Sequence, residues 1–597
     1  MFLDERYRIL FEPLKIGPVT APNRFYQVPH CNGMGYRDVS GMVALRAIKA
    51  EGGWGTVCTE QVEIHYTSEI TPFIELRIWD DRDVPLLARI TRAVHEYGSL
   101  AGIELAYNGI NGPNFYSREV PLGPSDLPTL TFTNDPVQAR AMTKSDISDL
   151  RRWHRNAALR AKSAGFDIIY VYGAHGFGAP QHFISRRFNH RTDEYGGILK
   201  NRARLLVELI EDTKEALGLL GAAVKAYVAP KTIAITGSSG KTTVKEMCAA
   251  ILERRGNVLA TNGNFNNDIG VPLTLLRLEP QHEYAVMELG ANHIGEIAYT
   301  TNLVKPDVAT IVNAAASHLE GFGSLLGVAR AKSEIFKGLG SDGVAVVNVD
   351  SQFAEFWQGK LKQTKTLTFS PQQKNDADFR AEDITIGLDG CAAFHLVCPQ
   401  GDMSIQLTIP GVHNVGNALV AAALTLQVGA TLENVRDGLL AMKQVSGRLN
   451  VKQLTEQVRL LDDTYNANVA SVNAAIDTLS SFSGIRVLVL GDMKELGEKA
   501  RYYHEQVGEY AKEKGINYLY TMGVLSQSAS AVFNENSGHF SDVESLLAAM
   551  ESDLLVQQRD ISILVKGSRS SRMERVVEAV EASALGKHDS RRERIAC

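Results

Sequence analysis

The stretch from Thr236 to Thr243, Thr-Gly-Ser-Ser-Gly-Lys-Thr-Thr, has the residue types of a loop that binds the phosphates of a nucleotide. The apolar run Thr232–Ile235 precedes it, and a helical pattern, Val244–Leu252, follows it. Glycines let backbone N–H groups approach an anion, and the start of a helix adds its positive end. A lysine can reach the β- and γ-phosphates, and the hydroxyl beside it can ligate Mg²⁺. The residues in these roles are Gly237, Ser238, Ser239, Gly240, Lys241, Thr242 and Thr243.

The spacing of the glycines leaves a second interpretation open. Gly237 and Gly240 enclose fewer residues than the glycines of the common phosphate loop do. An ordinary turn between a strand and a helix, with an exposed lysine, would show the same residues. The strand before the loop and the helix after it favour the nucleotide site.

Glu288 ends the apolar run Ala285–Met287, where a carboxylate can face Mg²⁺. A solvated acid at the end of a strand is the alternative. The polar loop Thr261–Gly270 is rich in asparagine, which suits hydrogen bonding to a substrate but also suits turns. His318 follows an apolar run and Lys332 lies in a helical pattern. On spacing alone, His318 is equally consistent with a polar surface residue. Lys332 is equally consistent with a surface lysine paired with a nearby acid.

The bulk properties set the context for these residues. A chain of 597 residues is too long for one core and predicts about three to five domains. The net charge of −6 predicts no general attraction to nucleic acid, and the apolar runs are too short for a membrane span. Six scattered cysteines form no CxxC pair and indicate a reducing, cytoplasmic setting.

The first part of the chain alternates apolar runs with helical patterns, which predicts an α/β fold with a parallel sheet. The predicted strands are 24–29, 55–60, 100–105 and 167–172, and the predicted helices include 84–94 and 147–164. These make about four βα units. A closed (β/α)₈ barrel needs twice as many, so we expect a half barrel.

Several motifs in this part resemble the old yellow enzyme family, and most of all its trimethylamine and dimethylamine dehydrogenases. The motifs are Leu10–Gly17, Pro22–Cys31, Tyr170–His175 and Asn189–Gly197 with Asn201 and Arg202. The resemblance covers about residues 6–217. It implies that Cys31 would hold FMN covalently, that Tyr172 and His175 would be active-site groups, and that Gln61 would favour a dimethylamine-type pocket.

The resemblance stops at about Leu217. No fifth barrel strand follows, and the cysteine cluster that would hold an iron–sulfur centre is absent from the sequence. We therefore keep open that Cys31, Tyr172 and His175 are inherited residues without a working flavin site.

The rest of the chain, residues 218–597, resembles the Mur ligases, and most of all those that join D-alanyl-D-alanine to a UDP-N-acetylmuramoyl-tripeptide. The resemblance implies a central ATP-binding domain at 218–445 and a Rossmann-like domain at 446–597. It also implies ATP and Mg²⁺ as cofactors, transfer of the γ-phosphoryl group to the substrate carboxylate, and attack of an amine on the acyl phosphate.

The family's functional residues fall on matching positions of this sequence. The resemblance makes Glu288 and His318 metal ligands and Lys332 a lysine that CO₂ carbamylates. It places Asn417 at the adenine, Arg448 at an ATP phosphate and Asp463 on a loop that meets the nucleotide. With Lys241, the residues Lys332, His318 and Glu288 are the catalytic candidates.

The family's domain that grips the UDP end of the substrate has no counterpart in residues 1–217, where the half barrel stands instead. We therefore expect weakened binding of the UDP-linked substrate, because remote binding energy is lost. Two alternatives remain: a flavin-dependent oxidoreductase, and an inactive chimera. The junction near 215–219 has no linker rich in proline, glycine or serine, which favours the chimera.

Overall fold

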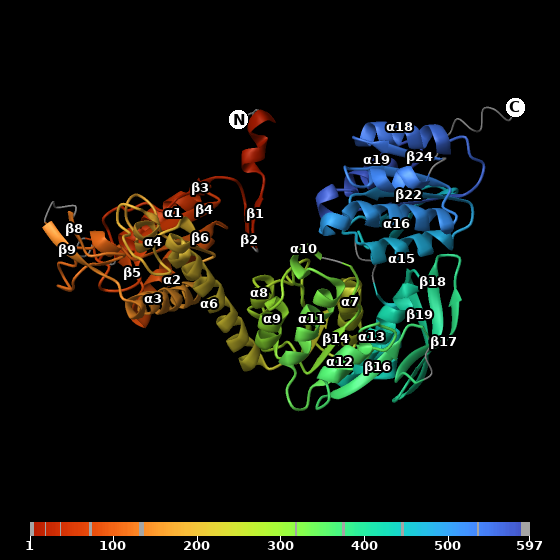
Figure 1. Ribbon diagram of the computed structural model, residues 1–597, viewed down its shortest axis with the longest axis horizontal. Coiled ribbons are helices and arrows are strands. Elements are labelled where there is room, and N and C mark those ends of the chain that lie inside the picture. Colours follow the sequence, from red (N-terminus) through yellow and green to blue (C-terminus); the bar gives the residue numbers. More distant parts are fainter. Residues whose placement is uncertain are drawn as a thin grey trace. The chain divides into compact units, whose positions relative to one another are not determined.

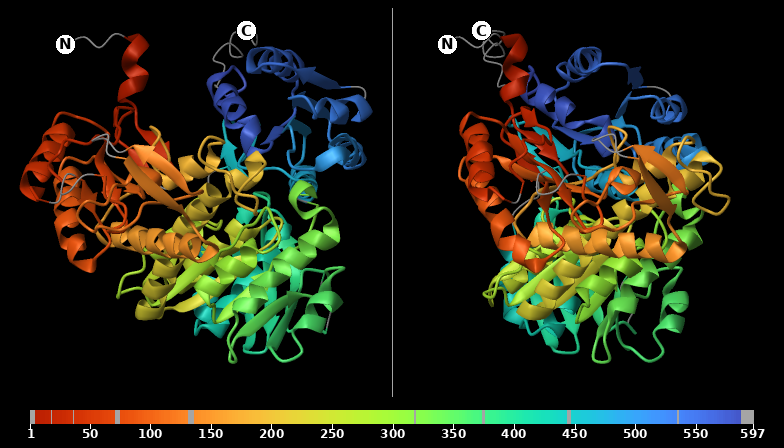
Figure 2. Two further views of the ribbon diagram at one scale, coloured as in Figure 1. Left: turned by 60° about the vertical axis from the view of Figure 1, so that its left-hand side comes forward. Right: turned by 90° about the vertical axis from the view of Figure 1, so that its left-hand side faces the viewer.

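A computed structural model describes residues 5–17, 19–35, 37–70, 75–130, 136–316, 319–372, 376–442, 447–533 and 536–586. The chain divides into two compact units, Met1–Ala223 and Val224–Cys597. Figures 1 and 2 show the elements of both, and each unit is described by itself.

Unit 1 is built on a parallel sheet with strand order β10-β6-β4-β3, to which β5 adds beside β4. Its strands are β3 Tyr26–Gln27, β4 Thr56–Glu63, β5 Leu76–Arg77, β6 Leu100–Ala106 and β10 Ile168–Val171. A helix follows each of the four strands in the main order, so the predicted βα units are confirmed. The sheet ends at β10 on one side and β3 on the other.

The helices of unit 1 are α1 Val39–Glu51, α2 Val84–His95, α3 Lys144–Ser163, α4 Ala179–Ile184 and α5 Leu199–Arg202, with 3-10 turns at Glu5–Phe11, Asp81–Asp83 and Gly109–Asn111. Helix α6, Arg204–Val228, begins in unit 1 and ends in the first residues of unit 2. Helix α3 begins three residues before the predicted Ile147 because Thr143 caps it. The Thr143 hydroxyl accepts from Asp146 N, and the Asp146 carboxylate accepts from Thr143 N at 2.7 Å. The reciprocal pair satisfies donors that would otherwise lack a partner at the helix start.

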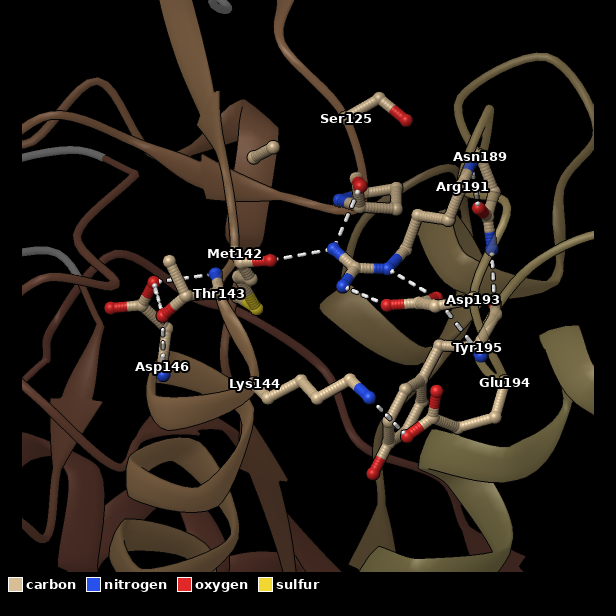
Figure 3. Close-up of polar contacts among 12 residues, drawn as sticks. Ser125, Met142, Thr143, Lys144, Asp146, Asn189, Arg191, Asp193, Glu194 and Tyr195 are labelled. Atoms are coloured by element: carbon tan, nitrogen blue, oxygen red, sulfur yellow. Dashed lines mark hydrogen bonds and ion pairs between the residues drawn. The ribbon is translucent and has the colours of Figure 1, made fainter.

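Two small sheets complete unit 1: a hairpin of β1 Leu14–Ile16 and β2 Val19–Ala21, and a sheet of β7 Leu122–Gly123, β8 Leu127–Leu130 and β9 Pro136–Ala141. Figure 3 shows the polar contacts that hold the segment around Arg191 next to the β7–β9 sheet. The Arg191 guanidinium donates to Met142 O at 2.5 Å and to Pro124 O at 3.2 Å, and pairs with Asp193 at 2.5 Å. Within the motif Asn189–Gly197, Arg191 therefore has a structural role, because it links this segment to the backbone at Pro124 and Met142.

The first part of unit 2 is a nine-stranded sheet of order β12-β13-β11-β14-β15-β16-β17-β18-β19. The pairings from β12 along this order to β17, β11 included, are all parallel. Strand β18 pairs antiparallel with both of its neighbours, β17 and β19. The strands are β11 Lys231–Thr236, β12 Val258–Ala260, β13 Tyr284–Glu288, β14 Val308–Ile311, β15 Val344–Asn348, β16 Lys365–Ser370, β17 Phe379–Ile386, β18 Cys391–Cys398 and β19 Gly401–Pro410.

Helices pack on this sheet through fully buried side chains. The helices are α7 Lys241–Leu252, α8 Gly270–Leu275, α9 Glu296–Val304, α10 Leu319–Phe322, α11 Leu325–Ser333, α12 Ala354–Lys360, α13 His413–Gln427 and α14 Leu432–Leu440, with a 3-10 turn at Glu334–Gly338. Helix α13 is apolar on nearly every side, and α7, α13 and α14 share one core cluster with the strands. A helix apolar all round belongs inside a protein, which explains why α13 lies in the core.

The second part of unit 2 is a six-stranded sheet of order β20-β21-β25-β22-β23-β24, parallel except for β20. Its strands are β20 Asn450–Gln453, β21 Val458–Asp463, β22 Ile485–Gly491, β23 Tyr518–Met522, β24 Ser537–Phe540 and β25 Ile561–Lys566. Its helices are α15 Val469–Ser480, α16 Ala500–Glu513, α17 Gln527–Phe533, α18 Val543–Leu554 and α19 Glu574–Ala582. Figure 1 shows α15 and α16 on one face of this sheet and α18 and α19 on the other. A separate core cluster forms on each face, one under α15, α16 and α17 and one under α18 and α19.

Among the described residues, no helix is both long and apolar enough to cross a membrane.

Candidate nucleotide and metal site

The predicted phosphate loop connects β11, an interior strand of the nine-stranded sheet, to α7. Strand β11 is buried from Thr232 onward, so the loop begins from a fixed point. Gly240 caps α7 with φ of 77°, in the left-handed region. A Cβ added there would lie 2.8 Å from Asn417 Oδ1. Only glycine combines this backbone with so close a neighbour.

A cavity of about 590 Å³ opens beside the loop, at the carboxyl ends of the neighbouring parallel strands. Open α/β sheets bind ligands at this edge. The predicted site residues that line it are Ser238, Ser239, Gly240, Lys241, Thr242, Thr243, Glu288, Lys332, Asn417, Arg448 and Asp463. They come from both parts of unit 2 and from segments far apart in the sequence.

Glu288 is the last residue of β13 and is 2% exposed. One carboxylate oxygen accepts from the Thr242 hydroxyl at 2.8 Å, and the other accepts from Asn266 Nδ2 at 2.8 Å. A carboxylate and a hydroxyl side by side at a phosphate loop are hard oxygen ligands, which fit Mg²⁺. Since Asn266 belongs to the asparagine-rich loop Thr261–Gly270, this loop fixes the position of the Glu288 carboxylate.

Lys241 and Lys332 both donate to the same backbone oxygen, that of Gly237, at 2.9 and 3.0 Å. Burial lowers the pKa of Lys332 well below its ordinary value, and the charge of Lys241 lowers it further. Burial also lowers the pKa of Lys241, against the attraction of Glu288. Two ammonium groups this close oppose each other's protonation, so the pair favours a neutral amine.

Asn313 is a loop-holding residue that the sequence did not single out. Its side-chain oxygen accepts from Ser238 N at 3.1 Å and from Ser239 N at 2.9 Å. It follows β14 immediately after Val312, and a polar residue directly after a buried strand was the available signal. By accepting from these two amides, Asn313 fixes the conformation of the loop backbone.

Asn417 lies on α13 against the phosphate loop. Its Nδ2 donates to Asn414 Oδ1 at 2.8 Å, and its Oδ1 faces Gly240. The resemblance implied that this asparagine contacts adenine. It gave no indication that the side chain also packs against the backbone of the phosphate loop.

Arg448 reaches the phosphate loop from the second part of unit 2. Its Nη2 donates to the Thr242 hydroxyl at 2.9 Å, and its guanidinium lies 4.3 Å from the centre of the Tyr465 ring. Asp463 accepts from Leu449 N at 3.2 Å. His318, the remaining predicted metal ligand, lies outside the described residues.

The predicted flavin-site residues of unit 1 are only partly brought together. The Tyr172 hydroxyl lies 3.3 Å from His175 Nδ1, and Gln61 pairs across the sheet with Glu104. Cys31 lies on the surface beside Glu60, and partial desolvation together with the charge of Glu60 raises the pKa of its thiol. A raised pKa disfavours the reactive thiolate. Since the parallel sheet ends at β10 in the described part of unit 1, the residues present do not fit a closed flavin site.

Comparison with known proteins agrees with this site. The Mur ligase middle domain matches residues 235–425, and the Mur ligase glutamate ligase domain matches residues 447–569. The chain belongs to the Mur ligase family and is an ATP-dependent ligase.

Within that family, it is 49% identical over 373 residues to the UDP-N-acetylmuramoyl-tripeptide–D-alanyl-D-alanine ligase of Escherichia coli K12, covering 62% of this chain and 82% of the relative. The crystal structure of MurF from Acinetobacter baumannii superposes with a TM-score of 0.59 at 35% identity, covering 64% of this chain and 88% of that one.

The first part of the chain matches a different family, NADH:flavin oxidoreductase / NADH oxidase, over residues 9–261. It is 43% identical over 230 residues to the dimethylamine dehydrogenase of Hyphomicrobium, covering 36% of this chain but 30% of that protein. Both resemblances predicted from the motifs are therefore confirmed. The two family matches overlap at 235–261, and the structure places those residues in β11, α7 and β12 of the nine-stranded sheet.

Proposed function

We propose that unit 2 joins the amine of D-alanyl-D-alanine to the terminal carboxylate of a UDP-N-acetylmuramoyl-tripeptide at the expense of ATP. The observation that carries the proposal is the cavity in which the phosphate loop, Glu288, the lysine pair and Arg448 meet. The name of the relatives that cover most of unit 2 supports this choice of substrates.

The proposed reaction has two steps. A carboxylate oxygen of the tripeptide attacks the γ-phosphorus, the bond to the bridging oxygen of ADP breaks, and ADP leaves. The amine nitrogen then attacks the acyl carbon, inorganic phosphate leaves, and the nitrogen loses a proton to solvent. Such transfers are accelerated by positioning and charge neutralisation. Amides of the phosphate loop bind the phosphates, and Lys241 exchanges Gly237 O for a phosphate oxygen.

Thr242 and Glu288 would hold Mg²⁺, with His318 as a further proposed ligand. Bound there, Mg²⁺ neutralises phosphate charge and orients the β- and γ-phosphates.

Lys332 is the proposed site of carbamylation. Only a neutral amine adds to CO₂, and burial beside Lys241 favours that form. The carbamate would carry a negative charge where an ammonium is costly, and it would relieve the crowding of two lysines on one carbonyl oxygen.

We also propose that the UDP end of the substrate contributes little to binding. The family's UDP-gripping domain has no counterpart in the sequence of residues 1–217, which match a flavin oxidoreductase family instead. Lost remote contacts raise the free energy of the transition state as well as that of the bound substrate.

The test is phosphate release from ATP by the full chain. We expect release to require both the UDP-linked tripeptide and D-alanyl-D-alanine, and to fall at least roughly 100-fold in Lys241→Ala. Lys231→Ala is the matched control, because Lys231 is 63% exposed at the other end of β11. Release that ignores either substrate, or that survives Lys241→Ala, would contradict the proposal. If the UDP end contributes little to binding, a tripeptide substrate that lacks UDP should have a KM similar to that of the UDP-linked tripeptide.

A further inference from the structure

We propose that Lys566 is a positioning residue of the ligase: its ammonium group fixes the loop that aims Arg448 at the phosphate loop. Lys566 is the last residue of β25 and is 2% exposed. Asp463, its register partner on β21, places Oδ2 at 2.5 Å from Lys566 Nζ. The same Nζ donates to Asn466 O at 2.9 Å. One cation thus ties the start of the 463–468 loop to its middle.

The loop in turn holds both neighbours of Arg448. The second oxygen of Asp463 accepts from Leu449 N at 3.2 Å, and Tyr465 N donates to Gly447 O at 3.0 Å. Leu449 has φ of 52° and Gly447 has φ of 70°. A leucine in the left-handed region persists only where its surroundings hold it. Asp463 supplies that support, and Lys566 supplies the counter-charge of Asp463.

Two side chains of this assembly reach the phosphate loop. Arg448 stacks over Tyr465 and donates to the Thr242 hydroxyl, and Asn468 Nδ2 donates to Ser238 O at 3.2 Å. Lys566 also lines the cavity, but both of its hydrogen bonds go to the 463–468 loop, so its effect on the phosphates is exerted through that loop and Arg448. This is the reason to class it as a positioning residue.

The inference rests on the ATP-dependent reaction, but binding of a non-hydrolysable ATP analogue tests it without any acceptor substrate. Its failure is therefore distinguishable from failure of the proposed substrates. The full chain is compared with Lys566→Met, Arg448→Met and the double variant, by calorimetric affinity for the analogue, steady-state kinetics and thermal midpoint.

Lys452→Met is the matched control. Lys452 lies in the same sheet and forms an ion pair of the same 2.5 Å length with Glu581, but its side chain is 37% exposed and does not line the cavity. We expect this control to leave the kinetics unchanged.

We expect Lys566→Met to lower kcat roughly 10- to 100-fold, as small misplacements of active-site groups do. The KM for D-alanyl-D-alanine should change less than about threefold, because the change acts on the phosphate end of the site. The double variant should bind the analogue within about twofold of Arg448→Met, because residues in one network are not additive.

Losses that add in the double variant would overturn the proposal, since they would mean that Lys566 acts independently of Arg448. Unchanged kcat in Lys566→Met would also overturn it. If Lys566→Met lowers the thermal midpoint strongly, Asp463→Asn replaces it in the same cycle. That variant keeps the shape of the side chain and removes its charge, and the same two outcomes decide.

Discussion

Glu288→Gln is the most direct test of the proposed metal site, because it removes a charge and almost no volume. In the structure, Thr242 and Asn266 each donate to one of the two carboxylate oxygens. A glutamine has one oxygen, so its amide nitrogen must face one of these donors. The Thr242 hydroxyl accepts from Arg448 at 2.9 Å and donates its single proton to Glu288, so an amide nitrogen facing it would deprive that proton of its acceptor.

The magnitude follows from the contact that is lost. A hydrogen bond to a charged acceptor contributes about 1.5–3 kcal/mol, which corresponds to roughly 10- to 150-fold in rate. Loss of a proposed Mg²⁺ ligand adds to this, so the expected drop in kcat/KM is at least roughly 100-fold. Because a weaker ligand set needs more metal, the Mg²⁺ concentration for half-maximal activity should also rise.

The assay is phosphate release across a Mg²⁺ titration, with the thermal midpoint measured in parallel. Glu283→Gln is the control, since Glu283 is exposed just before the start of the same strand. Full activity of Glu288→Gln at every Mg²⁺ concentration would refute the reasoning. Equal losses in both variants would do so as well.

Other predictions test the lysine pair, the phosphate loop and unit 1. Lys332→Met should abolish ligation yet raise the thermal midpoint in CO₂-free buffer. The gain should grow as the pH falls below about 10, because the unfolded lysine takes up a proton that the buried one resists; a gain that shrinks would contradict this sign. Gly240→Ala should weaken ADP binding roughly tenfold through left-handed strain and the contact with Asn417, as measured by calorimetry. Gly98→Ala, in unit 1 at φ of 73° with nothing within 4 Å of the added Cβ, is its control and should bind ADP normally. Arg191→Ala should destabilise unit 1 by about 2–4 kcal/mol and leave ligation intact, as followed by the fluorescence of the tryptophans at 54, 79 and 153.

The local elements of the site could be predicted because their signals are short in range. The apolar run, the glycine turn and the helix start around Lys241 have a pattern that serves one backbone path. Glu288 was predicted for a similar reason, since it ends an apolar strand. Asn313 and Lys566 were missed because their role depends on a loop and a strand far away in the sequence. A polar residue directly after a strand can have many roles, and its neighbours in the sequence do not indicate which one it has.

By itself the sequence determined that this chain joins part of a flavin-oxidoreductase barrel to the ATP-binding parts of a Mur ligase. It could do so because family motifs and strand–helix alternation are properties of consecutive residues. Only the tertiary structure decided that Lys241 and Lys332 share one carbonyl oxygen, that Asn417 packs on Gly240, and that Arg448 reaches Thr242. Those contacts join residues up to 206 positions apart. Their distances are set by how two sheets and their helices pack, and no spacing along the chain records that.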